Sequence, residues 1–227
     1  MTVACPPRAD WPMLVVQNGG PMTAVPQDIR KGRKFDQVLA GARDIFLRDG
    51  FDGASVDDIA RAAGVSKATL YSYFPDKRLL FLEVAKAECR RQADEAEALI
   101  DDGAPVAQVL ALAAERILAF AQSEFGQRMF RMCVAEAERF PTLGHEFYHS
   151  GPVMIRDRIA RYLAKTVERG DLRIDDINLA ADQFTQLCKA DLHDRLIFGV
   201  ADCCAPRDVA RVIDGAVTMF LACYGAR

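Results

Sequence analysis

Polar and aromatic side chains that could bind a nucleic acid are concentrated between Ser55 and Lys77. In this stretch Leu70 and Phe74 are four residues apart, which predicts one buried helical face. The neighbouring hydroxyl, phenol and ammonium groups point outward, where they could donate hydrogen bonds to bases and phosphates. The predicted DNA contacts are Ser55, Ser66, Lys67, Thr69, Tyr71, Ser72, Tyr73 and Lys77. Those from Lys67 to Ser72 are expected to face the groove, and Ser55, Tyr73 and Lys77 are expected to reach phosphates.

A second pattern, running from His145 through Glu146 to His149, matches the HExxH spacing of zinc enzymes. Two histidines four residues apart on a helix can bind zinc while the glutamate acts as a base. The segment is short and bounded by prolines, and the only other histidine, His193, belongs to a different predicted helix. We therefore predict no catalytic residue, no metal ligand and no cofactor, so that the protein is not an enzyme. A zinc hydrolase or other metal-binding protein stays the alternative.

Methionine, cysteine and aromatic side chains share one face of the predicted helix 127–140 with Glu136. Flexible thioethers and aromatic rings suit an adaptable apolar pocket. The candidate ligand contacts are Phe120, Met129, Met132, Cys133, Glu136, Phe147, Tyr148, Met154, Gln183, Phe184 and Cys188. They predict an apolar or amphipathic small-molecule effector. The alternative is a core helix in which Glu136 pairs with an arginine such as Arg139.

Capping residues predict the two short helices that position the first set of side chains. Ser55 caps the first helix, and Gly64 follows it where a left-handed backbone is needed. Ser66 caps the second helix, Pro75 ends it, and Asp76 caps the next one. Two short helices joined by such a turn form a helix-turn-helix, in which the second helix reads base edges.

From Phe35 to Phe81 the chain resembles the N-terminal domain of the TetR/AcrR (tetracycline-repressor) family of transcriptional regulators. The resemblance rests on FLRDGFDGASVDDIA, AGVSKATLY and YFPDK followed by LLFLEV. It implies an all-α fold, with an N-terminal three-helix helix-turn-helix domain and a larger C-terminal helical ligand-binding and dimerisation domain. It also implies a homodimer that binds a palindromic double-stranded DNA operator, usually as a repressor released by a small ligand. The expected boundaries are 1–29 for a disordered leader, 30–81 for the DNA-binding domain (the head) and 82–227 for the ligand-binding and dimerisation domain (the body).

The sequence after the helix-turn-helix predicts consecutive helices over residues 76–100, 105–123, 127–140, 152–169, 176–199 and 206–224. The first of these starts in the head and is the expected physical link to the body. The last two are strongly apolar. By resemblance to the family they form a four-helix dimer interface with their symmetry mates, although two such helices could also pack inside one monomer.

Charge is unevenly distributed along the chain, whose net charge is −3. Residues 30–81 contain ten Lys or Arg against seven Asp or Glu, so the head carries +3 and the remainder −6. A basic head on an acidic body suits phosphate contact at one end. The basic cluster from Arg30 to Lys34 is either a solvated tail or an arm lying along the DNA.

Composition narrows the remaining classes of protein. A membrane-spanning helix needs about 18 consecutive apolar residues without charge, and no run in this sequence is nearly that long. No membrane partner is therefore predicted. Seven cysteines without CxxC spacing indicate a reducing compartment, here the cytoplasm. Five prolines among the first 29 residues indicate the disordered leader, and Met22 is a second candidate start. A helical adaptor whose head binds a protein rather than DNA is the other open alternative.

Overall fold

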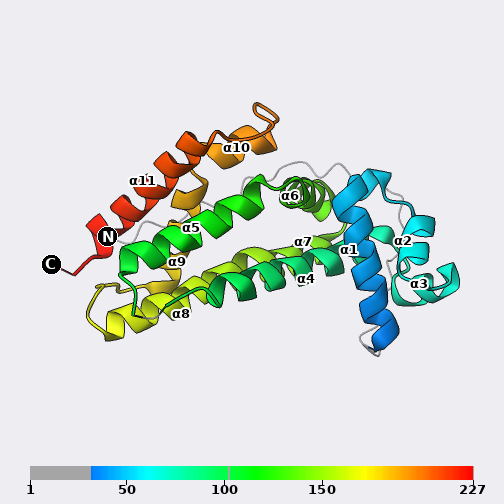
Figure 1. Cartoon of the computed structure of the whole chain (residues 1–227), viewed down its shortest axis with the longest axis horizontal. Helices are drawn as coiled ribbons and strands as arrows, with labels where there is room; N and C mark the ends of the chain where they lie inside the picture. Colours follow the sequence, from blue (N-terminus) through cyan, green and yellow to red (C-terminus); the bar gives the residue numbers. More distant parts are fainter. Residues whose placement is uncertain (1–31, 102, 227) are drawn as a thin grey trace, which may run out of the picture. The chain divides into compact units, whose positions relative to one another are not determined.

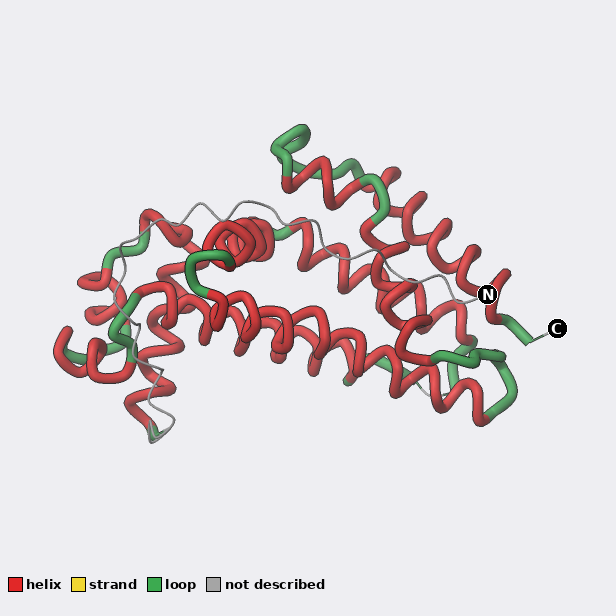
Figure 2. The backbone as a smooth tube through the Cα atoms, turned by 180° about the vertical axis from the view of Figure 1, so that it is seen from behind, coloured by secondary structure: helices red, strands yellow, loops and turns green. Residues whose placement is uncertain are grey.

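Helices make up the regular structure of the chain in the computed structural model, which describes residues 32–101 and 103–226 (Figure 1). Over these residues the backbone forms helices and loops but no strand, and an isolated β-bridge joins Leu172 to Gly225 (Figure 2). The predicted all-α fold is confirmed for this part of the chain. The leader expected at residues 1–29 lies outside the described residues.

Three helices build the head: α1 (Arg33–Gly53), α2 (Val56–Ala62) and α3 (Lys67–Tyr73) (Figure 1). The side chain of Ser55 accepts a hydrogen bond from the backbone N–H of Asp58 at 3.0 Å, which caps α2. The side chain of Ser66 accepts one from Thr69 at 3.1 Å, which caps α3. Gly64 lies between these helices with a φ of +63°, a conformation that only glycine adopts without a steric penalty. The predicted caps and turn are therefore confirmed.

Helix α4 (Lys77–Glu97) runs from the head into the body. Asp76 caps it by accepting the backbone N–H of Arg78 at 2.8 Å. The helix packs against α1 and also against α5 (Val106–Gln122). The described residues all belong to one compact unit. The boundary expected between residues 81 and 82 falls inside α4, which is continuous there.

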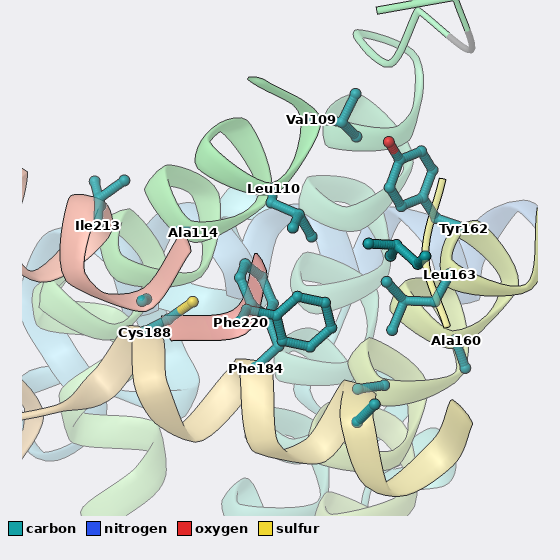
Figure 3. Packing of buried hydrophobic residues seen from close by; sticks show 14 of the residues in the cluster. Val109, Leu110, Ala114, Ala160, Tyr162, Leu163, Phe184, Cys188, Ile213 and Phe220 are labelled. Carbon is teal, nitrogen blue, oxygen red and sulfur yellow. The ribbon is translucent and has the colours of Figure 1, made fainter. Parts of the chain in front are cut away.

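The hydrophobic core of the body contains side chains from five helices. They are α5, α8 (Met154–Glu168), α9 (Ile177–Lys189), α10 (Leu192–Ile197) and α11 (Pro206–Tyr224). Figure 3 shows part of this packing. Phe184 of α9 and Phe220 of α11 are fully buried and lie edge to face, with ring centroids 5.3 Å apart. One face of each of the two apolar C-terminal segments therefore packs inside the monomer.

Two predicted helix boundaries in the middle of the chain are wrong. The helix expected over residues 127–140 is α6 (Glu124–Ala137), which starts earlier because Ser123 caps it. Pro152, expected to open a helix, instead lies inside a π-helical turn, η1 (His149–Val153), that joins α7 (Pro141–Tyr148) to α8 without a break. Proline removes a hydrogen bond and crowds the preceding turn, and widening of one turn accommodates it here.

The single helix predicted over residues 176–199 is interrupted in the structure. Helix α9 ends at Lys189, and α10 starts at Leu192. Asp191 between them has a φ of +67°, and its carboxylate accepts a hydrogen bond from Arg211 of α11 at 2.7 Å. A tertiary partner 20 residues further along the chain therefore anchors a break that the local sequence does not indicate.

Within the described residues, no single helix has both the length and the hydropathy needed to cross a membrane. Helices α5 and α6 have that length and hydropathy only when they are counted as one segment, and the angle between them is 69°.

Candidate DNA interface and ligand cavity

The outer face of α3 presents polar and aromatic side chains to solvent. Leu70 is 1% exposed and holds the inner face in the head, whereas Tyr71 is 48% exposed. Lys67 and Ser72 are also exposed, and Thr69 is half-buried. The side chains predicted to face a groove thus share the accessible side of one short helix. Among the described residues the hydroxyl of Tyr71 has no hydrogen-bond partner.

Hydrogen bonds within the head orient the smaller polar groups of α3. The Oγ of Ser66 and the Oγ1 of Thr69 lie 2.9 Å apart, and the Oγ of Ser72 donates to the carbonyl of Thr69 at 2.7 Å. The ammonium of Lys67 pairs with the carboxylate of Asp57 on α2. The polar face of α3 is therefore held in one arrangement by contacts that the protein makes with itself.

Two of the expected phosphate contacts lie beside this face. Ser55 is exposed and, besides capping α2, donates from Oγ to Oδ2 of Asp58 at 2.6 Å. Hydrogen bonds from Ser55 and Arg61 lower the pKa of Asp58. Tyr73 is half-buried, with the edge of its ring against Phe35 at a centroid distance of 5.9 Å. Both side chains support the fold of the head at positions close to its surface.

Lys77, expected to reach a phosphate, makes several contacts inside the head. Its Nζ donates to the carbonyl oxygens of Phe51 at 2.8 Å and Ala54 at 3.2 Å, and it lies 4.5 Å from the centroid of the Phe51 ring. These carbonyls are at the C-terminal end of α1, where a cation is favourable. Because two of its three N–H donors are used inside the head, we remove Lys77 from the expected phosphate contacts.

Arg78 joins the start of α4 to α6. Its guanidinium pairs with Asp76, donates from Nη1 to Oε2 of Glu136 at 2.9 Å, and lies 4.0 Å from the centroid of the Phe140 ring. The hydrogen bond between Arg78 and Asp76 lowers the pKa of the carboxyl and raises the pKa of the guanidinium. Glu136, a predicted ligand contact, is thus paired with Arg78 and not with Arg139, the partner considered from the sequence.

Glu88 of α4 is the only buried carboxylate in the described part of the chain and is 4% exposed. It accepts hydrogen bonds from the Nε of Arg43 on α1 at 2.8 Å, the Nε of Arg91 at 3.0 Å and the Nε2 of Gln92 at 2.9 Å. Burial disfavours its charge, but the hydrogen bonds from Arg91, Arg43 and Gln92 outweigh that penalty and lower the pKa of Glu88 to about 2. This carboxylate therefore ties α4 to α1 of the head.

A cavity of about 270 Å³ lies among α4, α5 and α8. Its walls are mainly apolar and include Ala93, Ala96, Ala113, Ile117, Phe120 and Ile159. Val109 and Leu110 from α5 and Tyr162 from α8, which also line it, are drawn in Figure 3. Burial raises the pKa of the Cys89 thiol in its wall to about 12, so this cysteine stays protonated. The volume and the mainly apolar walls suit a small apolar or amphipathic molecule, and four charged residues, Glu97, Arg116, Arg158 and Lys165, also line the cavity.

Of the predicted ligand contacts, Phe120 alone lines this cavity. The others belong to α6, α7, α8 and α9 and are absent from its walls: Met129, Met132, Cys133, Glu136, Phe147, Tyr148, Met154, Gln183, Phe184 and Cys188. Phe184 and Cys188 are buried in the body core, and Gln183 accepts a hydrogen bond from the hydroxyl of Tyr224 at 2.6 Å. Alanines spaced along α4 and α5 are the sequence signal for this cavity, since small side chains leave space between helices.

The HExxH pattern brings two histidines together but no third ligand. The rings of His145 and His149 have centroids 4.3 Å apart. Glu146, which would have to act as the base, instead pairs with Lys86 at 3.0 Å. Within residues 32–101 and 103–226, no group of three or more His, Cys, Asp and Glu side chains could hold a metal ion. The zinc-hydrolase alternative therefore gains no support.

Two family models match the chain. The model described as "AefR-like transcriptional repressor, C-terminal domain" matches residues 108–226, more than half of the chain, and "Bacterial regulatory proteins, tetR family" matches residues 38–84. The first model covers most of the body, and the second covers the helix-turn-helix and the start of α4.

Solved structures and curated relatives agree with these matches. A TetR-family transcriptional regulator from Mesorhizobium loti is 29% identical with a TM-score of 0.75, covering 87% of this chain and 100% of that one. The flavonoid-responsive regulator FrrA is 33% identical with a TM-score of 0.64, covering 86% of this chain and 99% of that one. The transcriptional repressor AcnR of Corynebacterium efficiens is 36% identical over 58 residues, 26% of this chain and 31% of AcnR.

The chain spans about a third of the length of the curated relatives it matches. The body is matched by the C-terminal family model and by structures that this chain covers almost completely. The head, the body and their order along the chain all agree, and this protein belongs to the TetR family of bacterial transcriptional regulators.

Proposed function

We propose that the protein is a sequence-specific DNA-binding repressor that leaves a palindromic operator when a small apolar or amphipathic ligand binds. The observation that carries this proposal is the exposed polar face of α3, held on a capped helix-turn-helix. A helix of this kind enters the major groove with its N-terminal residues against base edges. The protein would act in the cytoplasm, where bacterial DNA lies.

The DNA contacts in this proposal follow from the surroundings of each side chain. The proposed groove-facing residues are Lys67, Thr69, Tyr71 and Ser72. Ser55, Ser66 and Tyr73 would contact the sugar-phosphate backbone from positions beside α3. Two copies related by a two-fold axis would place their recognition helices about 34–36 Å apart, one turn of DNA.

Replacing Tyr71 with alanine is expected to raise the Kd for the operator about tenfold or more while leaving thermal unfolding unchanged. An exposed side chain contributes little to stability, whereas one good contact to a base edge is worth about 1–3 kcal/mol. The matched control is Tyr148→Ala, because Tyr148 is 54% exposed but lies on α7. Equal operator affinity of the two variants would remove Tyr71 from the interface.

A dimer interface formed by α9 and α11 is supported by apolar side chains that these helices leave exposed. Leu179 is 52% exposed and Met219 is 61% exposed, although both helices also bury a face in the monomer. The combined change Leu179→Glu and Met219→Glu is expected to give a monomer in sedimentation velocity, because it adds charges to an apolar contact surface. Leu99→Glu, at an exposed position after α4, should leave the dimer intact. A dimer that survives the double change would exclude this surface.

The cavity among α4, α5 and α8 is the proposed effector site. A ligand can release DNA only if it binds one arrangement of the heads more tightly than another. Helix α4 contributes Gln92 to the cavity wall. Gln92 donates a hydrogen bond to the carboxylate of Glu88, which also accepts one from Arg43 of α1. This chain of contacts supports a route from the cavity to the head. The related regulator FrrA is named for its response to flavonoids, which are small aromatic molecules.

The proposed function is tested by fluorescence polarisation of the purified protein with DNA from upstream of its own gene, with scrambled DNA as competitor. We expect tight binding that resists the competitor at physiological salt and that Tyr71→Ala weakens. Binding no tighter than binding to heparin, on this DNA and on genome-wide fragments, would overturn the proposal. That result would favour a head that binds protein.

A further inference from the structure

We propose that the cavity takes an anionic amphipath, an apolar chain or ring with one carboxylate, and that Arg116 of α5 binds the carboxylate. The inference deepens the proposed function and rests on it only in treating the cavity as a ligand site. It rests on the charged side chains that line the cavity. Basic side chains outnumber acidic ones there, and the acidic one is already in ion pairs.

The acidic groups near the cavity are already neutralised. Glu97 in its wall accepts a hydrogen bond from Nη1 of Arg158 at 2.6 Å and lies 3.5 Å from Nη2 of Arg161. The neighbouring carboxylate of Asp94 is paired with the other terminal nitrogen of Arg158. A cationic ligand would have to compete with these guanidinium groups for Glu97, so the acidic side of the cavity is a poor cation site.

The basic groups are more numerous than the acidic ones in the cavity wall. Arg116, Arg158 and Lys165 line the cavity, against Glu97 alone. Among the described residues Arg116 pairs with no carboxylate. It is exposed to solvent and also lines the cavity, so no partner in the described part of the chain competes for its guanidinium. A planar guanidinium can bind a carboxylate through two parallel hydrogen bonds.

The rest of the wall suits the tail of such a molecule. Ile117 and Phe120 follow Arg116 on the same side of α5, and Ile155 and Ile159 of α8 also line the cavity. The volume of about 270 Å³ is slightly below the about 300–1,000 Å³ of sites for drug-sized ligands. One medium-length alkyl chain or one small ring system therefore suits the space better than a larger ligand.

The test is isothermal titration calorimetry of the full chain, without DNA, with three probes of equal length: decanoate, decan-1-ol and decylammonium at neutral pH. Decanoate is expected to bind about tenfold more tightly than the alcohol, a difference of about 1.4 kcal/mol, and the ammonium most weakly. Arg116→Gln should remove the advantage of decanoate over the alcohol. Arg90→Gln, which makes the same charge change on α4 outside the cavity wall, should preserve it.

A second variant locates the binding. Ala113→Phe places a ring in the cavity wall and should abolish binding of decanoate. Persistence of that binding would show that the site lies elsewhere and overturn the proposal. Equal affinity for the three probes, a preference for the ammonium, or no measurable binding of any probe would also overturn it. Since no DNA is present, a failure here is distinct from a failure to bind an operator.

Discussion

Replacement of Gly50 with alanine is expected to lower the free energy of unfolding by about 3 kcal/mol. Gly50 bends the end of α1 with a φ of +69° and a ψ of −176°, a region of backbone space that is essentially restricted to glycine. An added Cβ would also lie 1.4 Å from Nη1 of Arg128 on α6, so that side chain would have to move. Backbone strain of this kind costs about 1–3 kcal/mol, and displacement of a packed arginine adds to it.

Urea denaturation followed by circular dichroism measures this effect. Gly53→Ala is the matched control, because Gly53 ends the same helix without a positive φ, and its added Cβ would meet only Asp49, at 3.4 Å. The control should change stability by less than about 1 kcal/mol. If Gly50→Ala lowered the free energy of unfolding no more than Gly53→Ala does, the surrounding structure would not be holding the bend at Gly50.

Replacement of Glu88 with glutamine is expected to cost about 3 kcal/mol of stability at neutral pH. The pKa of Glu88 is lowered from 4.5 to about 2, and each unit corresponds to about 1.36 kcal/mol. Glutamine keeps the shape of the protonated carboxyl but removes the charge that Arg43 and Arg91 bind. The exposed Glu95, which also pairs with Arg91, supplies the control Glu95→Gln, with an expected loss of at most about 0.5 kcal/mol.

The same carboxylate predicts a pH dependence with a definite sign. A folded-state pKa below the ordinary value means that the stabilisation is present above about pH 4.5 and is lost as the pH falls towards about 2. Unfolding measured across this window should show a smaller acid-induced loss for Glu88→Gln than for the unchanged protein. Parallel curves for the two proteins would show that Glu88 is not strongly stabilised as a carboxylate.

The head was largely predictable because its determinants are local. Ser55, Ser66 and Asp76 each cap a helix through a residue two or three positions away, and Gly64 meets a requirement of the turn that it occupies. Hydrophobic spacing also indicated that Leu70 faces inward and left Tyr71 on the outside. Such rules depend on a few neighbouring residues, so the local amino-acid sequence is enough to predict these caps, this turn and this buried face.

The cavity lies mostly away from the ligand contacts predicted from the sequence, since Phe120 alone of them lines it. Most of the methionines and aromatic rings that the sequence suggested belong to α6, α7 and α9, with Phe120 on α5 and Met154 on α8. Large apolar side chains fill a core as readily as they line a pocket. The observed cavity depends on small residues such as Ala93 and Ala113, and on how far apart α4, α5 and α8 pack. The position of a cavity depends on how whole helices pack, so no single residue type in the sequence predicts it.

By itself, the sequence determined the family, the all-helical class and the exposed face of α3, because these follow from motifs and spacings within a few turns of helix. The tertiary structure decided the pairings between distant residues. Arg43 binds Glu88 across 45 positions, Arg78 binds Glu136 across 58, and Lys77 binds the carbonyl of Phe51 across 26. A charged side chain takes whichever partner the packed helices bring within hydrogen-bond distance, and that choice is made only when the chain is folded.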